Sequence, residues 1–192
     1  MSYRKTIVLK DGNKVAIQPL TAKEDIRKFQ RFINAMVGEG VYLILDKPMT
    51  FKEEKAWFHN QILTIKKGDL IYLKVVASGH LIGVVQAQRG MYRNRGNVSL
   101  GIALEKQWRG KGLGRLLIQE MIVRIEQKWH PKNIYLHVVS SNQRAKRLYE
   151  SLGFHIIARL PQWFEYNKKY FDEYILILDK KRYQQDSKQH KC

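Results

Sequence analysis

Hydrophobic and polar residues alternate along the chain in blocks that predict strands first and helices next. Two short segments, Arg4 to Leu9 and Val15 to Ile17, flank an Asp11-Gly12-Asn13 turn, which is the pattern of a β-hairpin. Thr21 is placed to cap a helix that runs through Met36, because apolar residues then recur every three or four positions. These apolar residues are Ile26, Phe29, Phe32 and Ile33.

A second helix is predicted after an irregular region that begins at Gly38 and ends near Pro48. Thr50 and Glu53 have the spacing of a capping box, in which each side chain binds the other residue's backbone N–H. The residues expected to point inward from this helix are Trp57, Ile62 and Leu63. Three apolar segments separated by turn residues then predict an antiparallel meander over 70–76, 81–88 and 98–104.

The rest of the chain alternates between helix and strand. Apolar residues at helical spacing predict a long amphipathic helix that ends before Pro131. They are Leu113, Leu117, Met121, Ile125 and Trp129, with Leu116 and Ile122 widening the stripe. A buried strand over 134–139 should be followed by a helix that Ser140 or Ser141 caps and that a left-handed Gly153 ends. Strands near 154–160 and 174–178 complete the pattern.

The predicted order of elements is β-β-α-α-β-β-β-α-β-α-β-β. Such an order indicates an α/β fold with a mixed, mostly antiparallel central sheet, one parallel crossover and helices on both faces. Because 192 residues without an internal repeat or linker build one core more readily than two, we expect a single domain over 1–179. Residues 180–192 carry five basic residues and one acidic residue, so we expect them to form a basic, flexible tail.

Composition excludes several classes of function. Cys192 is the single cysteine, so no disulfide framework or cysteine-based metal site can form within the chain. The six histidines include no His-x-x-x-His pair, and we expect no metal. No apolar run approaches the length of a membrane span, so we expect a soluble, cytoplasmic protein without a membrane partner. The sequence leaves the oligomeric state open.

Charge is the unusual feature of the composition. The chain has 35 basic and 17 acidic residues, which gives a net charge of +18. Between Lys106 and Arg147 there are ten basic residues and two acidic ones, so the excess is concentrated around one glycine-rich loop. Such a surplus favours an anionic partner, namely a phosphorylated cofactor, nucleic acid or an acidic substrate. A solvated surface that serves solubility or thermal stability is the alternative.

The glycine-rich loop, with the sequence QWRGKGLGR over 107–115, joins a predicted strand to a predicted helix. Glycine weakens a helix, so bare backbone must be needed there. The first-turn N–H groups of a helix are unpaired and lie at the positive end of its dipole, where they can bind phosphate. The P-loop pattern is absent and the spacing is wrong for the dinucleotide pattern G-x-G-x-x-G. Gln107, Gly110 and Gly112 meet a third pattern, Q/R-x-x-G-x-G/A.

With this loop the chain resembles the GNAT superfamily of acyl-CoA N-acyltransferases. A second stretch, Ser141 to Phe154, is similar to the N-x-x-A-x-x-L-Y-x-x-x-G-F helix and turn of that superfamily, and it follows the loop at the expected distance. The resemblance is most specific over 98–154 and extends in outline from 15 to 178. The opening hairpin also resembles the entry to the amino-terminal and ribosomal-protein acetyltransferase branches. The resemblance therefore implies a GNAT-like sheet.

The resemblance also implies acetyl-CoA as the co-substrate, without a metal. It places the pyrophosphate on the backbone N–H groups of the loop, which belong to Arg109, Gly110, Lys111, Gly112, Leu113 and Gly114. It pairs the pantetheine arm with the backbone of one strand, at Ile102, Ala103 and Leu104, as a missing strand would pair. Asn142 would hydrogen-bond the same arm. Arg144, Lys146 and Arg147 are candidates to contact the 3′-phosphate or adenine side of the cofactor, with a solvated helix face as the alternative.

Acyl transfer from a thioester to an amine requires a neutral amine, a donor for the oxyanion and a proton for the thiolate. The resemblance places the hydroxyl of Tyr149 near the sulfur, where a phenol with a pKa near 10 can act as the acid. Packing or cofactor binding alone is the alternative for Tyr149. A backbone N–H at or near Leu104 is the expected oxyanion donor.

The general base has three candidates. His137 stands where some amino-terminal acetyltransferases of the superfamily have a glutamate, and imidazole titrates near neutrality. As a strand residue between Leu136 and Val138 it can equally be a sheet-face residue without a catalytic role. Glu39, in the loop that frames the acceptor in the superfamily, and Glu105, just past a strand, are the alternatives. Because of the departure at 137, the mechanism of the ribosomal-protein enzymes does not transfer directly.

The acceptor is expected to be a primary amine, on a protein amino terminus, a lysine or a small molecule. In related enzymes the aromatic segment before the last strand covers the acceptor cleft, which makes Trp163, Tyr166 and Tyr170 candidate walls, with core packing as the alternative. Two other functions stay open: a basic RNA- or ribosome-binding protein, and a CoA-binding regulatory module without catalysis. No RNP-type aromatic motif supports the former, and Asn142 and Tyr149 argue against the latter.

Overall fold

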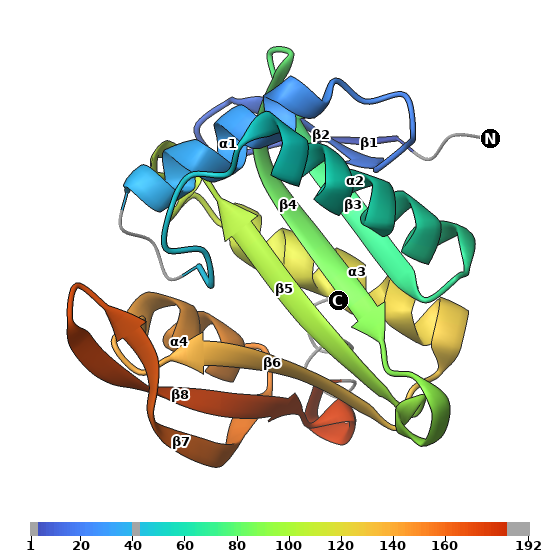
Figure 1. Ribbon diagram of the computed structural model, residues 1–192. Helices are drawn as coiled ribbons and strands as arrows, with labels where there is room; N and C mark the ends of the chain where they lie inside the picture. Colours follow the sequence, from blue (N-terminus) through green and yellow to red (C-terminus); the bar gives the residue numbers. More distant parts are fainter. Residues whose placement is uncertain (1–3, 40–42, 184–192) are drawn as a thin grey trace.

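The strands and helices follow each other in the predicted order (Figure 1). The computed structural model describes residues 4–39 and 43–183. The strands are β1 (Lys5–Val8), β2 (Lys14–Pro19), β3 (Leu70–Ala77), β4 (His80–Arg89), β5 (Asn97–Leu104), β6 (Asn133–Val139), β7 (Phe154–Tyr166) and β8 (Lys169–Leu178). The helices are α1 (Ile26–Gly38), α2 (Phe51–Lys66), α3 (Leu113–Trp129) and α4 (Gln143–Glu150), with short 3-10 turns η1 (Tyr92–Asn94) and η2 (Lys106–Trp108).

The central sheet has eight strands in the order β1-β2-β3-β4-β5-β6-β8-β7. Every neighbouring pair is antiparallel except β5 and β6, which confirms the predicted mixed sheet with one parallel crossover. The parallel ladder has three pairs, Asn97–Asn133, Val98–Ile134 and Ser99–Tyr135, and beyond them the two strands diverge (Figure 1). The second half of β5 therefore presents an edge that β6 does not cover.

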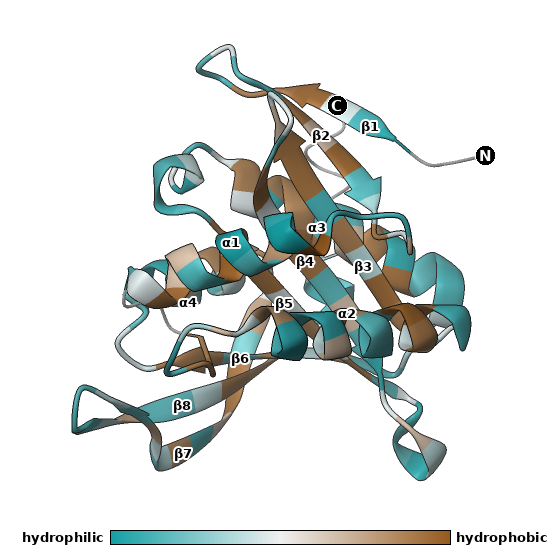
Figure 2. Cartoon of the chain, turned by 45° about the horizontal axis from the view of Figure 1, so that its top comes forward, coloured by the Kyte–Doolittle hydropathy of each residue, from teal (hydrophilic) through white to brown (hydrophobic). Residues whose placement is uncertain are grey.

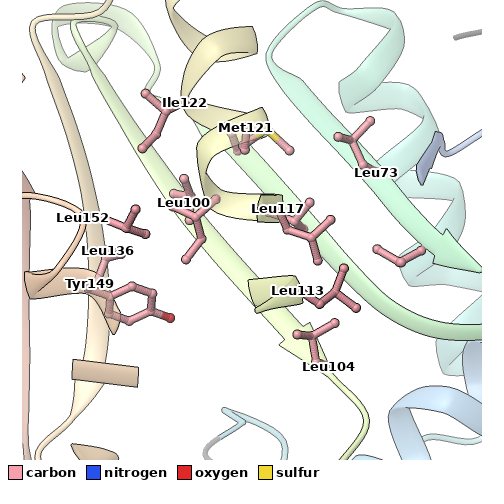
Figure 3. Close-up of a cluster of buried hydrophobic side chains, with 14 of the residues drawn as sticks. Leu73, Leu100, Leu104, Leu113, Leu117, Met121, Ile122, Leu136, Tyr149 and Leu152 are labelled. Carbon is pink, nitrogen blue, oxygen red and sulfur yellow. The ribbon is translucent and has the colours of Figure 1, made fainter. Parts of the chain in front are cut away.

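Helices cover both faces of the sheet, as expected (Figure 1). On one face α1 and α2 bury an aromatic cluster that includes Phe29, Phe32, Phe58 and Tyr72. On the other face α3 and α4 pack on a larger aliphatic cluster, part of which Figure 3 shows around Leu117. Figure 2 shows the hydrophobic residues concentrated on the central strands, whereas the tip of the β7–β8 hairpin is hydrophilic. The core thus lies on both sides of β3 to β5.

Two of the three predicted N-caps are wrong. Asp25, not Thr21, caps α1 by accepting the Arg27 N–H at 3.0 Å. Asn142, not Ser140 or Ser141, caps α4 by accepting the Ala145 N–H at 3.1 Å. Carboxylate, amide and hydroxyl oxygens all cap well, so the path of the chain decides which of several candidates meets the first turn. The capping box at Thr50 and Glu53 is confirmed.

The predicted inward faces of two helices are partly wrong. Leu63 of α2 and Leu116 of α3 are exposed, because each lies beside the buried stripe of its helix and not on it. The last two strands are longer than predicted, so the aromatic segment expected before the final strand forms the β7–β8 hairpin itself.

Residues 180–183 are the part of the expected tail that the structure describes, and they lie close to the domain. Residues 180–183 form a helical turn on which Asp179 caps the N–H groups of Lys181 and Arg182. The ammonium of Lys180 pairs with Glu126 of α3 at 2.8 Å. The rest of the expected tail, 184–192, lies outside the described residues. Within 4–39 and 43–183, no helix is both long and apolar enough to cross a membrane.

Glu54 is the single charged residue that is buried within the described ranges, with 2% of its surface exposed. It lies on the inner side of α2, where Phe58 and Ile62 are its buried neighbours along the helix. Burial raises the pKa of its carboxyl from 4.5 to about 7. The nearby charge of Glu54 also helps burial to raise the pKa of Tyr72. Ionisation of Glu54 therefore weakens this layer of the core.

The free energy of unfolding should fall by about 3 kcal/mol as pH rises from about 4.5 to about 7, since the unfolded chain loses the Glu54 proton first. Glu54→Gln removes this titration, so its stability should stay flatter across the same interval and exceed that of the parent at pH 8. Urea unfolding at several pH values measures this, with the exposed Asp46→Asn as the control. A parallel pH dependence in parent and Glu54→Gln would contradict the assignment.

Candidate active site

A cavity of about 640 Å³ lies where β5 and β6 diverge. Its walls come from both faces of the sheet. Met36 and Ala103 belong to the side that α1 and α2 cover, whereas Leu104, Leu148 and Tyr149 belong to the side of α3 and α4. The cavity therefore passes through the sheet, and a ligand in it can be reached from both faces.

The glycine-rich loop forms one wall of this cavity. Gly110 and Gly112 have φ values of +83° and +81°, in the left-handed region that disfavours side chains. A β-carbon at Gly110 would also collide with the guanidinium of Arg144, and one at Gly114 would lie 3.2 Å from Leu148. Gly112 is the N-cap residue of α3 and supplies no side-chain cap, which leaves the first-turn N–H groups for a ligand. The glycines thus allow the chain to take this path before α3, and they leave the first-turn N–H groups accessible to a ligand.

Most of the residues predicted to bind the cofactor line the cavity. They are Ile102, Ala103, Leu104, Arg109, Gly110, Gly112, Gly114, Asn142 and Tyr149. Lys111 does not line it, because its ammonium pairs with Asp11 of the β1–β2 turn at 2.8 Å and lies over the ring of Trp108. The same pair lowers the pKa of Asp11 to about 2. The side chain of Leu113 is wholly buried in the core, so only its backbone can contribute.

Asn142 and Ser141 bring polar atoms to the opposite wall. The Oδ1 atom of Asn142 caps α4, so its amide nitrogen is the atom left to donate to a ligand. The hydroxyl of Ser141 is buried and has no hydrogen-bond partner within the described chain. A buried polar atom without a partner is costly, and a ligand in the cavity would satisfy it. Sequence reasoning had assigned Ser141 only a capping role.

Tyr149 lies on α4 with 7% of its surface exposed, and it lines the cavity. Figure 3 shows its ring beside Leu136 and Leu152, with the hydroxyl pointing away from both. Burial raises the pKa of the phenol to about 12. The hydroxyl therefore keeps its proton across the physiological range and can donate a hydrogen bond into the cavity.

Glu39 lines the cavity, but an arginine holds its carboxylate. Arg109 Nη2 lies 2.8 Å from Glu39 Oε2, and Arg109 Nε donates to the carbonyl of Leu104 at 2.7 Å. Arg109 thereby ties the end of α1 to the end of β5 across the cavity. Glu105 does not line the cavity and accepts a hydrogen bond from the Gln107 amide at 3.1 Å.

His137 does not line the cavity that contains Tyr149. Leu136 and Val138, its neighbours along β6, are buried against the α3 side, so His137 projects from the opposite face of the sheet. Its side chain is 42% exposed there, and Nδ1 lies 3.0 Å from Oε2 of Glu173 on β8. The pair was not predicted, because only the register of β8 against β6 brings the two residues together.

The hairpin aromatics Trp163, Tyr166 and Tyr170 are exposed, so core packing does not account for them. Tyr166 pairs with Lys169, and alternation along β8 places Lys169 on the same face as Glu173. The adjacent Tyr170 therefore points from the other face. Of the three candidate walls, Tyr166 thus lies on the same sheet face as Glu173 and His137.

Within the described ranges, no three His, Cys, Asp or Glu side chains come together in a way that could hold a metal ion. The groups that can act at the cavity are thus backbone N–H groups, the phenol of Tyr149, the amide of Asn142 and the hydroxyl of Ser141, whereas the imidazole of His137 lies outside it.

Comparison with protein families matches residues 39–154 to the acetyltransferase (GNAT) family. N-alpha-acetyltransferase 60 of Xenopus tropicalis is 34% identical over 83 residues, which are 42% of this chain and about a third (34%) of that protein. The L-methionine sulfoximine/L-methionine sulfone acetyltransferase of Pseudomonas aeruginosa is 29% identical over 138 residues, which are 67% of this chain and 74% of that protein. This chain therefore spans a minor part of the first relative and most of the second.

Solved structures share the fold. The GNAT acetyltransferase of Streptococcus pneumoniae superposes with a TM-score of 0.74 at 23% identity, over 85% of this chain and 98% of that one. YncA of Salmonella typhimurium, solved with its cofactor acetyl-CoA, has a TM-score of 0.72 at 22% identity, over 85% and 92%. RimL, a ribosomal L7/L12 alpha-N-protein acetyltransferase in complex with coenzyme A, has a TM-score of 0.74 at 11% identity, over 90% and 97%.

Proposed function

The chain belongs to the acetyltransferase (GNAT) family, and on that premise we propose that it acetylates a primary amine by direct attack of the amine on the thioester of acetyl-CoA. It is an acetyl-CoA-dependent N-acetyltransferase. The observation that carries the proposed mechanism is the cavity that crosses the sheet between β5 and β6. One side of it holds the glycine loop and Tyr149, and the other side holds Met36 and Ala103, on the sheet face from which His137 projects.

The residues of the cavity suit acetyl-CoA. The unpaired N–H groups at the start of α3, with left-handed glycines around them, are a site for pyrophosphate oxygens. The uncovered edge of β5 at 102–104 can pair with the amides of the pantetheine arm, as a strand would. The amide nitrogen of Asn142 and the hydroxyl of Ser141 supply further donors beside it.

Tyr149 stabilises the sulfur that leaves. In the transfer step the amine nitrogen bonds to the acetyl carbon, the carbon–sulfur bond breaks, and the electron pair stays on sulfur. A phenol with a pKa of about 12 holds its proton more tightly than a thiol with a pKa of about 8.5. The Tyr149 hydroxyl therefore acts mainly as a hydrogen-bond donor to this developing charge, and complete proton transfer is not required.

His137 accepts the proton that the attacking amine loses, directly or through one water. Among the three candidates the geometry favours it for two reasons. The carboxylate of Glu39 is held by Arg109, and Glu105 is directed to Gln107. His137 has a ring nitrogen, Nε2, without a hydrogen-bond partner in 4–39 and 43–183, on the open face beside the gap.

We place a peptide amino terminus first among the acceptors. N-alpha-acetyltransferase 60 and RimL support this order by their names, and the exposed β7–β8 hairpin offers a peptide an extended surface beside His137. A lysine side chain or a small amine is the alternative, which the methionine sulfoximine and sulfone acetyltransferase supports.

A matched acceptor screen tests the proposal. The purified chain is given acetyl-CoA and one of four acceptors: a peptide with a free α-amino group, the same peptide blocked at that group but carrying a lysine, a polyamine, or methionine sulfone. We expect thiol release together with acetylation of the free peptide amino terminus, located by mass spectrometry. Transfer only to the blocked peptide or the small amines would overturn the order of acceptors. Salt-dependent binding of RNA without transfer to any acceptor would favour the scaffold function.

A further inference from the structure

We propose that Glu173 is a positioning residue for catalysis, which holds His137 in the tautomer and orientation that leave Nε2 free to take the proton of the acceptor amine. The inference rests on the proposed function, since it assumes that His137 is the base. It adds a residue from the last strand to a site otherwise built from the end of α1 and from the β5–α4 region.

The contact between the two side chains specifies the tautomer. A carboxylate has no proton to donate, so the 3.0 Å contact requires that His137 Nδ1–H donates to Glu173 Oε2. In neutral imidazole only one nitrogen carries a proton, so Nε2 is then the acceptor. A hydrogen bond on one ring nitrogen is the usual way in which proteins set the role of the other.

The strand register places His137 beside the opening in the sheet. His137 on β6 and Gly101 on β5 each lie two residues beyond the last ladder pair, Ser99–Tyr135, where the two strands have separated. Gly101 has no side chain to fill the space where the strands diverge, and only Gln86 of β4 lies within 4 Å of its β-carbon position. The ring of Tyr135 packs edge-on against the imidazole at 5.8 Å and limits its rotation.

Glu173 is positioned to orient His137, whereas the contacts within the hairpin are made by its neighbour Asp172. Its side chain is 16% exposed, so its carboxylate is largely removed from water and His137 is its observed partner. The adjacent Asp172 makes the structural contacts, because it pairs with Arg159 and accepts the N–H of Gln162 at 3.0 Å. We therefore expect the hairpin to keep these ion-pair and hydrogen-bond contacts when Glu173 is changed.

The test compares four proteins: the parent, Glu173→Gln, His137→Asn and the double variant. Glutamine keeps the size of Glu173 but can also donate a hydrogen bond, so it no longer imposes Nδ1–H. Glu165→Gln, an exposed change on the same hairpin, is the matched control. Two readouts are needed: steady-state kinetics, and ¹⁵N spectra of the imidazole, in which His137→Asn identifies the signal of His137.

We expect the His137 ring of the parent to carry its proton on Nδ1 and that of Glu173→Gln to shift toward Nε2–H. The kcat of Glu173→Gln should fall at least about tenfold, with little change in the KM for acetyl-CoA, because general-base catalysis contributes about 10²–10⁴-fold. The double variant should be no slower than His137→Asn, since Glu173 acts only through the imidazole. Glu165→Gln should match the parent.

The measurements distinguish failure of the hypothesis that His137 is the base from failure of the hypothesis that Glu173 positions it. A normal kcat in His137→Asn would remove His137 as the base, and the proposed role of Glu173 would fall with it. A large loss in His137→Asn but a normal kcat in Glu173→Gln would overturn the role of Glu173 alone. So would a parent ring that carries its proton on Nε2, or a double variant that is much slower than His137→Asn.

Discussion

Gly112→Asp should abolish measurable binding of acetyl-CoA while the protein stays folded. The position tolerates the side chain locally, because no atom lies within 4 Å of the added β-carbon and Asp is among the residues that enter the left-handed region most readily. Asp is also a good N-cap residue. Its carboxylate, however, would satisfy the first-turn N–H groups of α3 and repel a phosphate. We expect isothermal calorimetry to show at least a 100-fold loss of affinity.

Gly112→Asn separates charge from shape in this experiment. Asn has nearly the shape of Asp and also enters the left-handed region, but it brings no negative charge. We expect a loss of roughly tenfold, because steric occupation remains while the repulsion is absent. Equal losses in the two variants would show that occupation alone matters. Unchanged affinity in a folded Gly112→Asp protein would remove the glycine loop as the pyrophosphate site.

Tyr149→Phe should lower kcat at least about tenfold with little change in the affinity for acetyl-CoA. The ring keeps its contacts with Phe154 and the buried cluster, so α4 should pack as before. The proposed hydrogen bond to the sulfur is lost, and such a bond is strongest when negative charge develops there. Contributions of this kind are about 10²–10⁴-fold, and a slow release of product would hide part of the loss. The values of kcat and kcat/KM should fall together.

A control and a thermal unfolding measurement make this result specific. Tyr92→Phe removes a hydroxyl from an exposed tyrosine of η1 and should leave the kinetics unchanged. Equal melting temperatures for Tyr149→Phe and the parent would show that packing is intact. If Tyr149→Phe turns over at the normal rate, or loses only affinity, Tyr149 is a packing or binding residue. The proton of the thiol must then come from water or from the acceptor amine.

The order of strands and helices could be predicted because it depends on local patterns. Periodicity of two or of about 3.6 residues follows from the geometry of strand and helix, so the alternation over 98–104 and the stripe from Leu113 indicate their elements without any tertiary contact. The capping box at Thr50 is equally local, since its partner lies three residues away. The glycine loop could be proposed as a phosphate site for the same reason, because a phosphate site at a helix start is built from consecutive residues.

The tertiary structure alone decided how the remaining site residues are used. Lys111 was predicted to offer its backbone N–H to the phosphate, and the sequence did not show that Asp11, a hundred residues earlier, pairs with its ammonium at 2.8 Å. His137 pairs with Glu173 only because β8 returns beside β6 in one register, and a shift of that register by one residue would turn Glu173 to the other face. The sequence by itself determined which groups can do chemistry. The path of the chain determined which of them meet, because charges and hydrogen bonds act over a few ångströms and not along the sequence.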